Sequence, residues 1–143
     1  MKSTGANFEY EKERNEDLLR AYRREIDRCE RIGIEVWREI AESPSMRFWV
    51  SEERAAIVIA RVIKGDTLSY MRPLRREMFL EIYRRVLDIK SVRQELSLRA
   101  CCAKAVCTPA PKFYMTPLSV RQTIYKIKRK CLEEAKKRRR FFF

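Results

Sequence analysis

The last third of the chain contains a segment whose side chains suit contact with a polyanion. Apolar residues at positions 120, 124 and 127 predict an amphipathic helix with a buried seam that continues to Cys131. Arginine and glutamine side chains can hydrogen-bond base edges in a duplex groove, and lysines pair with phosphates. The side chains expected to face outward are Ser119, Arg121, Gln122, Tyr125, Lys126, Lys128, Arg129 and Lys130. We expect Ser119, Arg121 and Gln122 to contact bases. The residues expected to contact the nucleic-acid backbone from this helix are Lys126, Lys128, Arg129 and Lys130.

The segments on either side of this helix add more basic and aromatic groups. Thr116 and Pro117 are favourable as N-cap and first helical residue. Lys112 and Tyr114 precede them, and Lys112 is expected to contact backbone phosphates. A basic run follows the helix at Lys136, Lys137, Arg138, Arg139 and Arg140. We expect residues 136–143 to form a disordered tail that contacts phosphates, and Phe141–Phe143 to dock in a groove or at a membrane surface.

The order of residues in this helix resembles that of a known recognition helix. Ser119-Val120, then Ile124 and Ile127, then Arg129-Lys130 resemble the helix-turn-helix DNA-binding proteins of the LuxR type and of sigma-factor region 4. The resemblance covers about 15 residues and implies binding of double-stranded DNA through the major groove. The sequence departs from the pattern upstream, where Thr108-Pro-Ala-Pro-Lys replaces a helix and tight turn, so an atypical or winged variant remains open.

Residues 43–64 and 108–129 form an internal repeat, 65 positions apart. In each copy a basic residue and two aromatic residues precede a hydroxyl that can cap a helix, Ser51 or Thr116. Three pairs are identical: Pro44/Pro109, Phe48/Phe113 and Ile59/Ile124. In one hypothesis the first copy also binds nucleic acid; in the other, which we favour, it is a packing partner for the second. The second site would use Arg47, Trp49, Arg54 and Arg61.

The aromatic pairs of the two copies have different expected roles within each pair. We expect Phe48 and Phe113 to enter the core and hold the helix that follows. For Trp49 and Tyr114, burial and contact with a nucleotide are both open, since their polar tips suit a half-wet site.

The pattern of apolar residues predicts an all-α fold of about five helices in one domain, 1–143. It comprises an N-terminal helix over 8–42 that can break at Gly33, the first repeat at 43–66, central helices at 67–107, the second repeat at 108–135 and a tail at 136–143. The apolar stripe of the N-terminal helix consists of Leu19, Tyr22, Ile26, Cys29, Gly33, Val36 and Ile40. We favour packing for this stripe over a coiled-coil dimerisation arm.

Three further helices are expected between the long helix and the second repeat. The helix after Ser51 is apolar on most sides, which predicts burial. A second helix begins near Pro73, and a third runs from Ser91 to Val106. The expected face of the second consists of Met78, Phe79, Ile82, Tyr83, Val86 and Leu87.

The net charge of +13 lies entirely in the second half of the chain. Residues 1–65 hold 13 basic and 13 acidic side chains, whereas residues 66–143 hold 20 basic and 7 acidic ones. This asymmetry predicts a polyanionic partner, with DNA favoured over RNA and an anionic membrane second to nucleic acid. No stretch is apolar enough to span a membrane and the first 30 residues are charged, which predicts a cytoplasmic, nucleoid-associated protein, or a virion component.

The residue types needed for catalysis or metal binding are sparse. The chain has no His, no Gly-rich phosphate loop and no nucleophile motif, so we expect neither an enzyme nor a cofactor. The five Cys lack a Cys-x-x-Cys pair, so no metal is expected, and we interpret them as reduced, small buried side chains.

These features predict a non-catalytic DNA-binding protein, either a transcription regulator or an accessory factor of a phage or mobile element. The alternatives are a ribosome-associated RNA-binding protein and a phage structural or assembly protein with a basic face. A homodimer or another protein partner would use the 8–42 helix or the Phe141–Phe143 tail.

Overall fold

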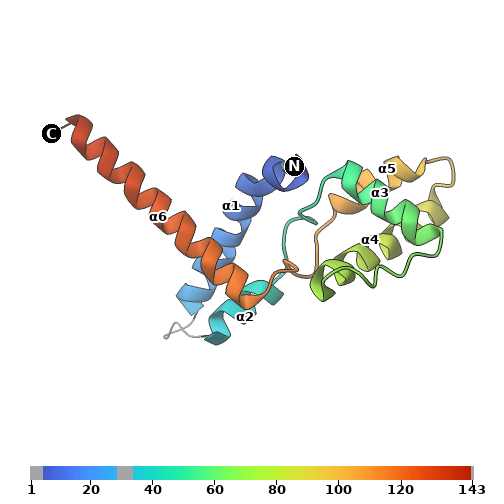
Figure 1. The fold of residues 1–143 in the computed structure, drawn as a ribbon, viewed down its shortest axis with the longest axis horizontal. Helices are drawn as coiled ribbons and strands as arrows, with labels where there is room; N and C mark the ends of the chain where they lie inside the picture. Colours follow the sequence, from blue (N-terminus) through green and yellow to red (C-terminus); the bar gives the residue numbers. More distant parts are fainter. Residues whose placement is uncertain (1–4, 29–33, 143) are drawn as a thin grey trace.

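The chain is all-α. The computed structural model describes residues 5–28 and 34–142. Six helices follow one another in these ranges (Figure 1). They are α1 (Gly5–Arg28), α2 (Ile34–Glu42), α3 (Glu52–Ile63), α4 (Pro73–Val92), α5 (Leu98–Val106) and α6 (Pro117–Phe142). The described residues contain no strand, only an isolated antiparallel bridge between Ser45 and Ala110. The predicted fold class is confirmed.

The helices pack around two separate hydrophobic cores. Module 1 consists of α1, α2 and α6, and module 2 of α3, α4 and α5. Figure 1 shows these two groups side by side, joined by the segments 43–51 and 108–116, here called linker 1 and linker 2. The largest fully buried side chains of module 1 include Leu18, Ile40 and Ile124, and those of module 2 include Phe79 and Ile82.

The repeat is larger than the segment visible in the sequence. When 65 is added to the residue numbers of the first repeat unit, 5–63, the ranges of α1, α2 and α3 fall on those of α4, α5 and α6. The helix contacts follow the same correspondence. The contact between α2 and α6 is equivalent to that between α5 and α3, and the contact between α1 and α6 is equivalent to that between α4 and α3. The whole fold is therefore a duplicated unit of three helices.

Burial repeats at the same interval even where residue type does not. Within 35–42, the part of α2 whose burial is described, each buried residue has a buried equivalent 65 positions later in α5. These pairs are Val36/Cys101, Trp37/Cys102, Ile40/Ala105 and Ala41/Val106. Ala55/Val120 and Ile59/Ile124 repeat the pattern on α3 and α6. Because packing fixes which positions are covered and leaves their identity free within volume limits, geometry persists while sequence diverges.

The third helix of each unit packs in the core of the other unit. α3 belongs to the first unit but completes module 2, and α6 belongs to the second unit but completes module 1. The two units therefore exchange their equivalent third helices within one chain, which is the intramolecular form of a domain swap.

The two linkers cross in antiparallel orientation and make equivalent backbone hydrogen bonds. Ser45 and Ala110 each donate a backbone N–H to the other's carbonyl, both at 3.0 Å. Phe48 N–H donates to the Val106 carbonyl at the end of α5, and Phe113 N–H donates to the Ala41 carbonyl at the end of α2, also at 3.0 Å. These partners are again 65 positions apart, so a local two-fold axis passes through the crossing.

The caps that begin and end the equivalent helices also match. Ser43 and Thr108 each direct their backbone N–H and hydroxyl to the carbonyl three residues earlier, which ends α2 and α5. Ser51 then accepts a hydrogen bond from Arg54 N–H, and Thr116 accepts one from Ser119 N–H. These hydroxyl caps, predicted from the sequence, begin α3 and α6.

Several predicted boundaries differ in the structure. The helix expected over 8–42, with a possible break at Gly33, begins earlier, at Gly5, and corresponds to α1 and α2, while Cys29 and Gly33 lie outside the described residues. The helix expected from Ser91 begins at Leu98, because Ser97 accepts a hydrogen bond from Ala100 N–H as its N-cap. The tail 136–143 was predicted to be disordered, which is wrong: α6 continues to Phe142, since Lys and Arg are good helix formers.

Some predicted core positions are exposed. Ile57 and Ile63 on α3 are 51% and 55% exposed, and the buried residues of α3, including Val58 and Ile59, lie where it packs against α4 and α5. Leu87 of the expected α4 face is also exposed. Cys101 and Cys102 are buried as expected, and burial raises the pKa of the Cys102 thiol to about 11. The same expectation was wrong for Cys107 and Cys131, which are exposed.

The exchange of helices predicts how the chain responds to cleavage between its two units. Ser69 and Tyr70 are both exposed in the α3–α4 loop, so a specific protease site inserted between them should leave both cores intact. After cleavage the halves should co-elute at the mass of the intact chain and separate only in denaturant. A matched site between Lys137 and Arg138 should release its peptide freely. Separation of the halves under native conditions would contradict the exchange.

Candidate nucleic-acid interface

α6 begins at linker 2 and is fixed to module 1 by its first three turns. Thr116 accepts a hydrogen bond from Ser119 N–H at 3.1 Å and donates its hydroxyl hydrogen to Ser119 Oγ at 2.9 Å. Val120 and Ile124 are fully buried against α1 and α2. The opposite side of the helix is consequently held facing outward.

A series of aromatic rings and cations connects α6 to the other helices of module 1. Tyr22 of α1 stacks on Trp37 of α2 with ring centroids 5.7 Å apart, and Tyr125 of α6 meets Trp37 edge-on at 5.9 Å. Arg121 lies 5.3 Å above the Tyr125 ring, and Lys128 lies 4.5 Å above Tyr22. Lys128 also donates a hydrogen bond to the Tyr22 hydroxyl at 2.5 Å. Cation–π contacts of this kind restrict the rotamers of Arg121 and Lys128.

Most of the side chains predicted to face outward on α6 do so. The exposed ones are Arg121, Gln122, Tyr125, Lys126, Lys128, Arg129 and Lys130. Ser119 is partly buried and engaged in the cap with Thr116, so a contact between Ser119 and a base would compete with that cap. The structure thus brings the central seven residues together on one surface.

The second half of α6 extends beyond module 1 (Figure 1). From Arg129 to Phe141 every residue is exposed except Ala135, and the segment includes Lys136, Lys137, Arg138, Arg139 and Arg140. In the described residues this basic arm therefore has little packing with the rest of the chain. Cys131, predicted to continue the buried seam, lies in this arm and is exposed.

Two predicted site residues of linker 2 lie away from the α6 surface, beside α4. Lys112 forms an ion pair with Glu77 at 2.7 Å, and its ammonium lies 5.7 Å from the Tyr114 ring. Tyr114 stacks on Phe48 with 6.0 Å between centroids and has a φ of 57°, in the left-handed region that is costly for a residue with a Cβ. Lys112 and Tyr114 are thus engaged with module 2.

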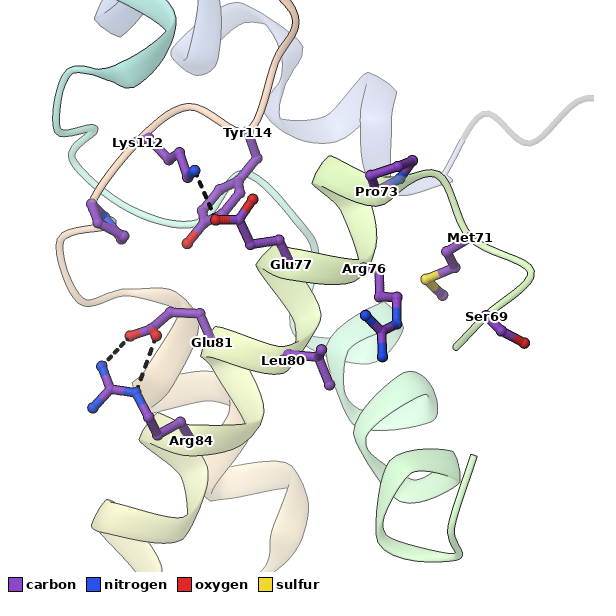
Figure 2. A pocket seen from close by; sticks show the side chains of 11 residues that line it. Ser69, Met71, Pro73, Arg76, Glu77, Leu80, Glu81, Arg84, Lys112 and Tyr114 are labelled. Carbon is purple, nitrogen blue, oxygen red and sulfur yellow. Dashed lines mark hydrogen bonds and ion pairs between the residues drawn. The ribbon is translucent and has the colours of Figure 1, made fainter. Parts of the chain in front are cut away.

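Lys112 and Tyr114 line a pocket of about 860 Å³ beside α4 (Figure 2). The wall from α4 carries Glu77 and Glu81, and Figure 2 shows the latter paired with Arg84. Hydrogen bonds from Arg84 lower the pKa of Glu81. Burial, followed by the charges of Glu81 and Glu77, raises the pKa of Tyr114 to about 12, because each opposes formation of the phenolate.

The four residues expected to form a second site in linker 1 and α3 do not share one exposed surface. Arg47 lies 4.3 Å above the Tyr10 ring and 5.6 Å above Trp49, and it donates to the Phe48 and Val50 carbonyls. Trp49 is partly buried, and among the described residues neither its Nε1 nor the Nε of Arg54 has a hydrogen-bond partner. Arg61 is exposed. Arg47 and Trp49 therefore have structural roles in linker 1, and the structure does not assemble a second basic surface from these four residues.

The role of Trp37 was not predicted. The sequence places Tyr22 in the packing stripe, but Trp37 lies one position from that stripe. Its neighbour Val36 occupies the expected core position, and the stripe spacing treats Trp37 as exposed. The signal available in the sequence was the size of the indole itself, since a Trp on a short amphipathic helix usually finds a packing partner.

Comparison with known proteins gave no match, whether to a family model, to a curated protein or to a solved structure. No helix among residues 5–28 and 34–142 is long and apolar enough to cross a membrane. In the same ranges, no group of three or more Cys, Asp or Glu residues is placed to hold a metal ion.

The raised pKa of Tyr114 makes a prediction about alkaline stability. The folded state favours the neutral phenol of Tyr114. The stability that this phenol contributes is therefore fully present below its ordinary pKa of 10 and is lost as the pH rises toward about 12. The free energy of unfolding of the Tyr114→Phe variant should fall less steeply than that of the wild type between pH 10 and 12. Urea unfolding titrations of both proteins at intervals of half a pH unit measure this difference. Equal slopes would show that Tyr114 titrates alike in both states.

Proposed function

We propose that this chain is a non-catalytic nucleic-acid-binding protein that binds double-stranded DNA through α6, as a regulator or an accessory factor of a phage or mobile element. The observation that carries the proposal is the charge on one helix. α6 holds ten basic and two acidic residues, and its side opposite Val120 and Ile124 is open to solvent. Such a surface binds a polyanion by neutralising phosphates and releasing counterions.

The preference for duplex DNA rests on the form of α6. The major groove of B-DNA admits an α-helix, whereas the deep, narrow major groove of A-form RNA does not. Arg121 and Gln122 are the side chains near the start of α6 that can make bidentate contacts to base edges, and both are exposed. The contact between Arg121 and Tyr125 supports base recognition because it limits the entropy lost when the guanidinium is fixed.

The basic arm supports the same proposal on energetic grounds. A short helix that lacks tertiary packing is marginal in water, and the five consecutive cations of residues 136–140 repel one another. Phosphates along a duplex would remove that repulsion and stabilise the arm. We therefore assign backbone contacts to the arm and base contacts to the first turns of α6.

RNA or a single strand is the second candidate, favoured by one observation. Tyr125 is 46% exposed and lies beside Arg121, an arrangement on which an unpaired base can stack. Stacking of this kind tolerates any base, so it would not give sequence preference on a duplex.

Two alanine variants test the DNA proposal by separating base contacts from phosphate contacts. Arg121→Ala should cost about 1–3 kcal/mol on the preferred duplex and relax sequence preference, because a bidentate contact is lost. Lys126→Ala should weaken all duplexes alike and reduce the salt slope by about one, because one phosphate contact is lost. Binding isotherms at several salt concentrations measure both effects.

The control variant is Lys104→Ala, which removes an equal charge from an exposed position of α5 in module 2 and should leave binding unchanged. Equal effects of Arg121→Ala and Lys126→Ala on every sequence would refute base recognition. Tighter binding of structured RNA than of duplex DNA in direct competition would favour the second candidate. An absence of binding to both nucleic acids at low salt would refute the proposal as a whole.

A further inference from the structure

The exposed side of α3 carries a stripe that is acidic at one end, apolar in the middle and basic at the other end. Glu53, Ile57, Ala60 and Lys64 recur at intervals of four, three and four residues, so they share one face of the helix. Ile57 is 51% exposed and the Glu53 side chain 76% exposed. α4 and α5 pack on the other side of α3, where Val58 and Ile59 are buried.

Duplication alone does not account for this stripe. The equivalent positions on α6 are Leu118, Gln122, Tyr125 and Arg129, which contain no carboxylate. The two helices bury two equivalent pairs of residues, Ala55/Val120 and Ile59/Ile124, yet their outward sides have diverged. On α6 this stripe has one cation and no carboxylate, whereas on α3 it carries both charges around an apolar centre, so the two surfaces suit different partners.

The stripe on α3 is complementary to itself when two copies are antiparallel. A two-fold axis midway along the stripe places Glu53 opposite Lys64 of a second copy, and Ile57 opposite Ala60. The small Ala60 leaves space for the larger Ile57, as close packing of two helices requires. We propose that the chain forms a homodimer through an antiparallel pair of α3 helices. This interface is separate from the 8–42 helix and the Phe141–Phe143 tail expected from the sequence.

The charges on each copy set the strength expected for the dimer. Each chain carries a net charge of +13, so long-range repulsion opposes association, and only the local pairing of Glu53 with Lys64 offsets it. Glu53 is also 3.2 Å from Arg99 of its own chain, but both side chains are largely exposed, so the carboxylate can accept a second cation. A single pair of short helices buries less area than a typical stable interface. We therefore expect a weak dimer, with a dissociation constant on the order of 10–100 µM.

Charge reversal across the two-fold axis tests this interface, with sedimentation equilibrium as the measurement and no nucleic acid present. Glu53→Lys and Lys64→Glu should each weaken dimerisation about tenfold, because each replaces two symmetric attractions with two repulsions. The double variant should restore the wild-type constant. Lys64→Glu best separates the proposed pairing from general charge repulsion. It lowers the net charge of each chain by two, so general repulsion alone would predict tighter association, whereas the proposed pairing predicts weaker association.

The matched control is Arg38→Glu, which makes the same charge reversal at an exposed position of α2 in module 1 and should not weaken the dimer. Thermal melts of each variant at a concentration below the dissociation constant check that the monomer is folded. A wild-type chain that stays monomeric at about 500 µM would refute the homodimer, as would a Lys64→Glu variant that associates as well as or better than wild type. Neither outcome depends on whether α6 binds DNA.

Discussion

The rest of the structure depends on the crossing of the two linkers. Four backbone hydrogen bonds, all of 3.0 Å, hold Ser45 against Ala110 and tie Phe48 and Phe113 to the ends of α5 and α2. Each linker thus begins at a helix end in one module and delivers the next helix to the other module. Without the crossing, α3 and α6 could each fold back onto their own unit. The crossing therefore decides that module 1 presents the basic helix α6.

The exchange also separates the two functions that we propose. Because α3 and α6 occupy equivalent places in different cores, their buried sides are constrained alike while their outward sides are free to diverge. In module 1 the rings of Tyr22, Trp37 and Tyr125 order the cations that face outward. In module 2 the outward side of α3 has exposed Ile57 between opposite charges.

Local features of the fold could be predicted from the sequence, but its connectivity could not. The hydroxyl caps at Ser51 and Thr116 and the burial of Phe48 and Phe113 depend on neighbouring residues, and the structure confirms them. An apolar seam shows which face of a helix is buried but does not identify the helix that covers it. The exchange of α3 and α6 therefore could not be predicted from the sequence. The equivalence of α1 and α4 could not be recognised from the sequence either. Core packing constrains the volume of a side chain more than its identity, so equivalent helices can lose their sequence similarity. The run of five cations at 136–140 predicts a disordered tail, but Lys and Arg are also good helix formers, and the structure is helical there.

The most direct test of the exchange is a pair of contacts to Trp37, one of only two tryptophans in the chain. In the exchanged fold its indole meets the ring of Tyr125 at 5.9 Å, whereas in an unexchanged fold the equivalent neighbour would be Ala60 of α3. A nuclear Overhauser spectrum should show cross-peaks from the Trp37 ring to the Tyr125 and Tyr22 rings. Cross-peaks from Trp37 to the Ala60 methyl, without those to Tyr125, would contradict the exchange and remove the support for the proposal that module 1 binds DNA through α6.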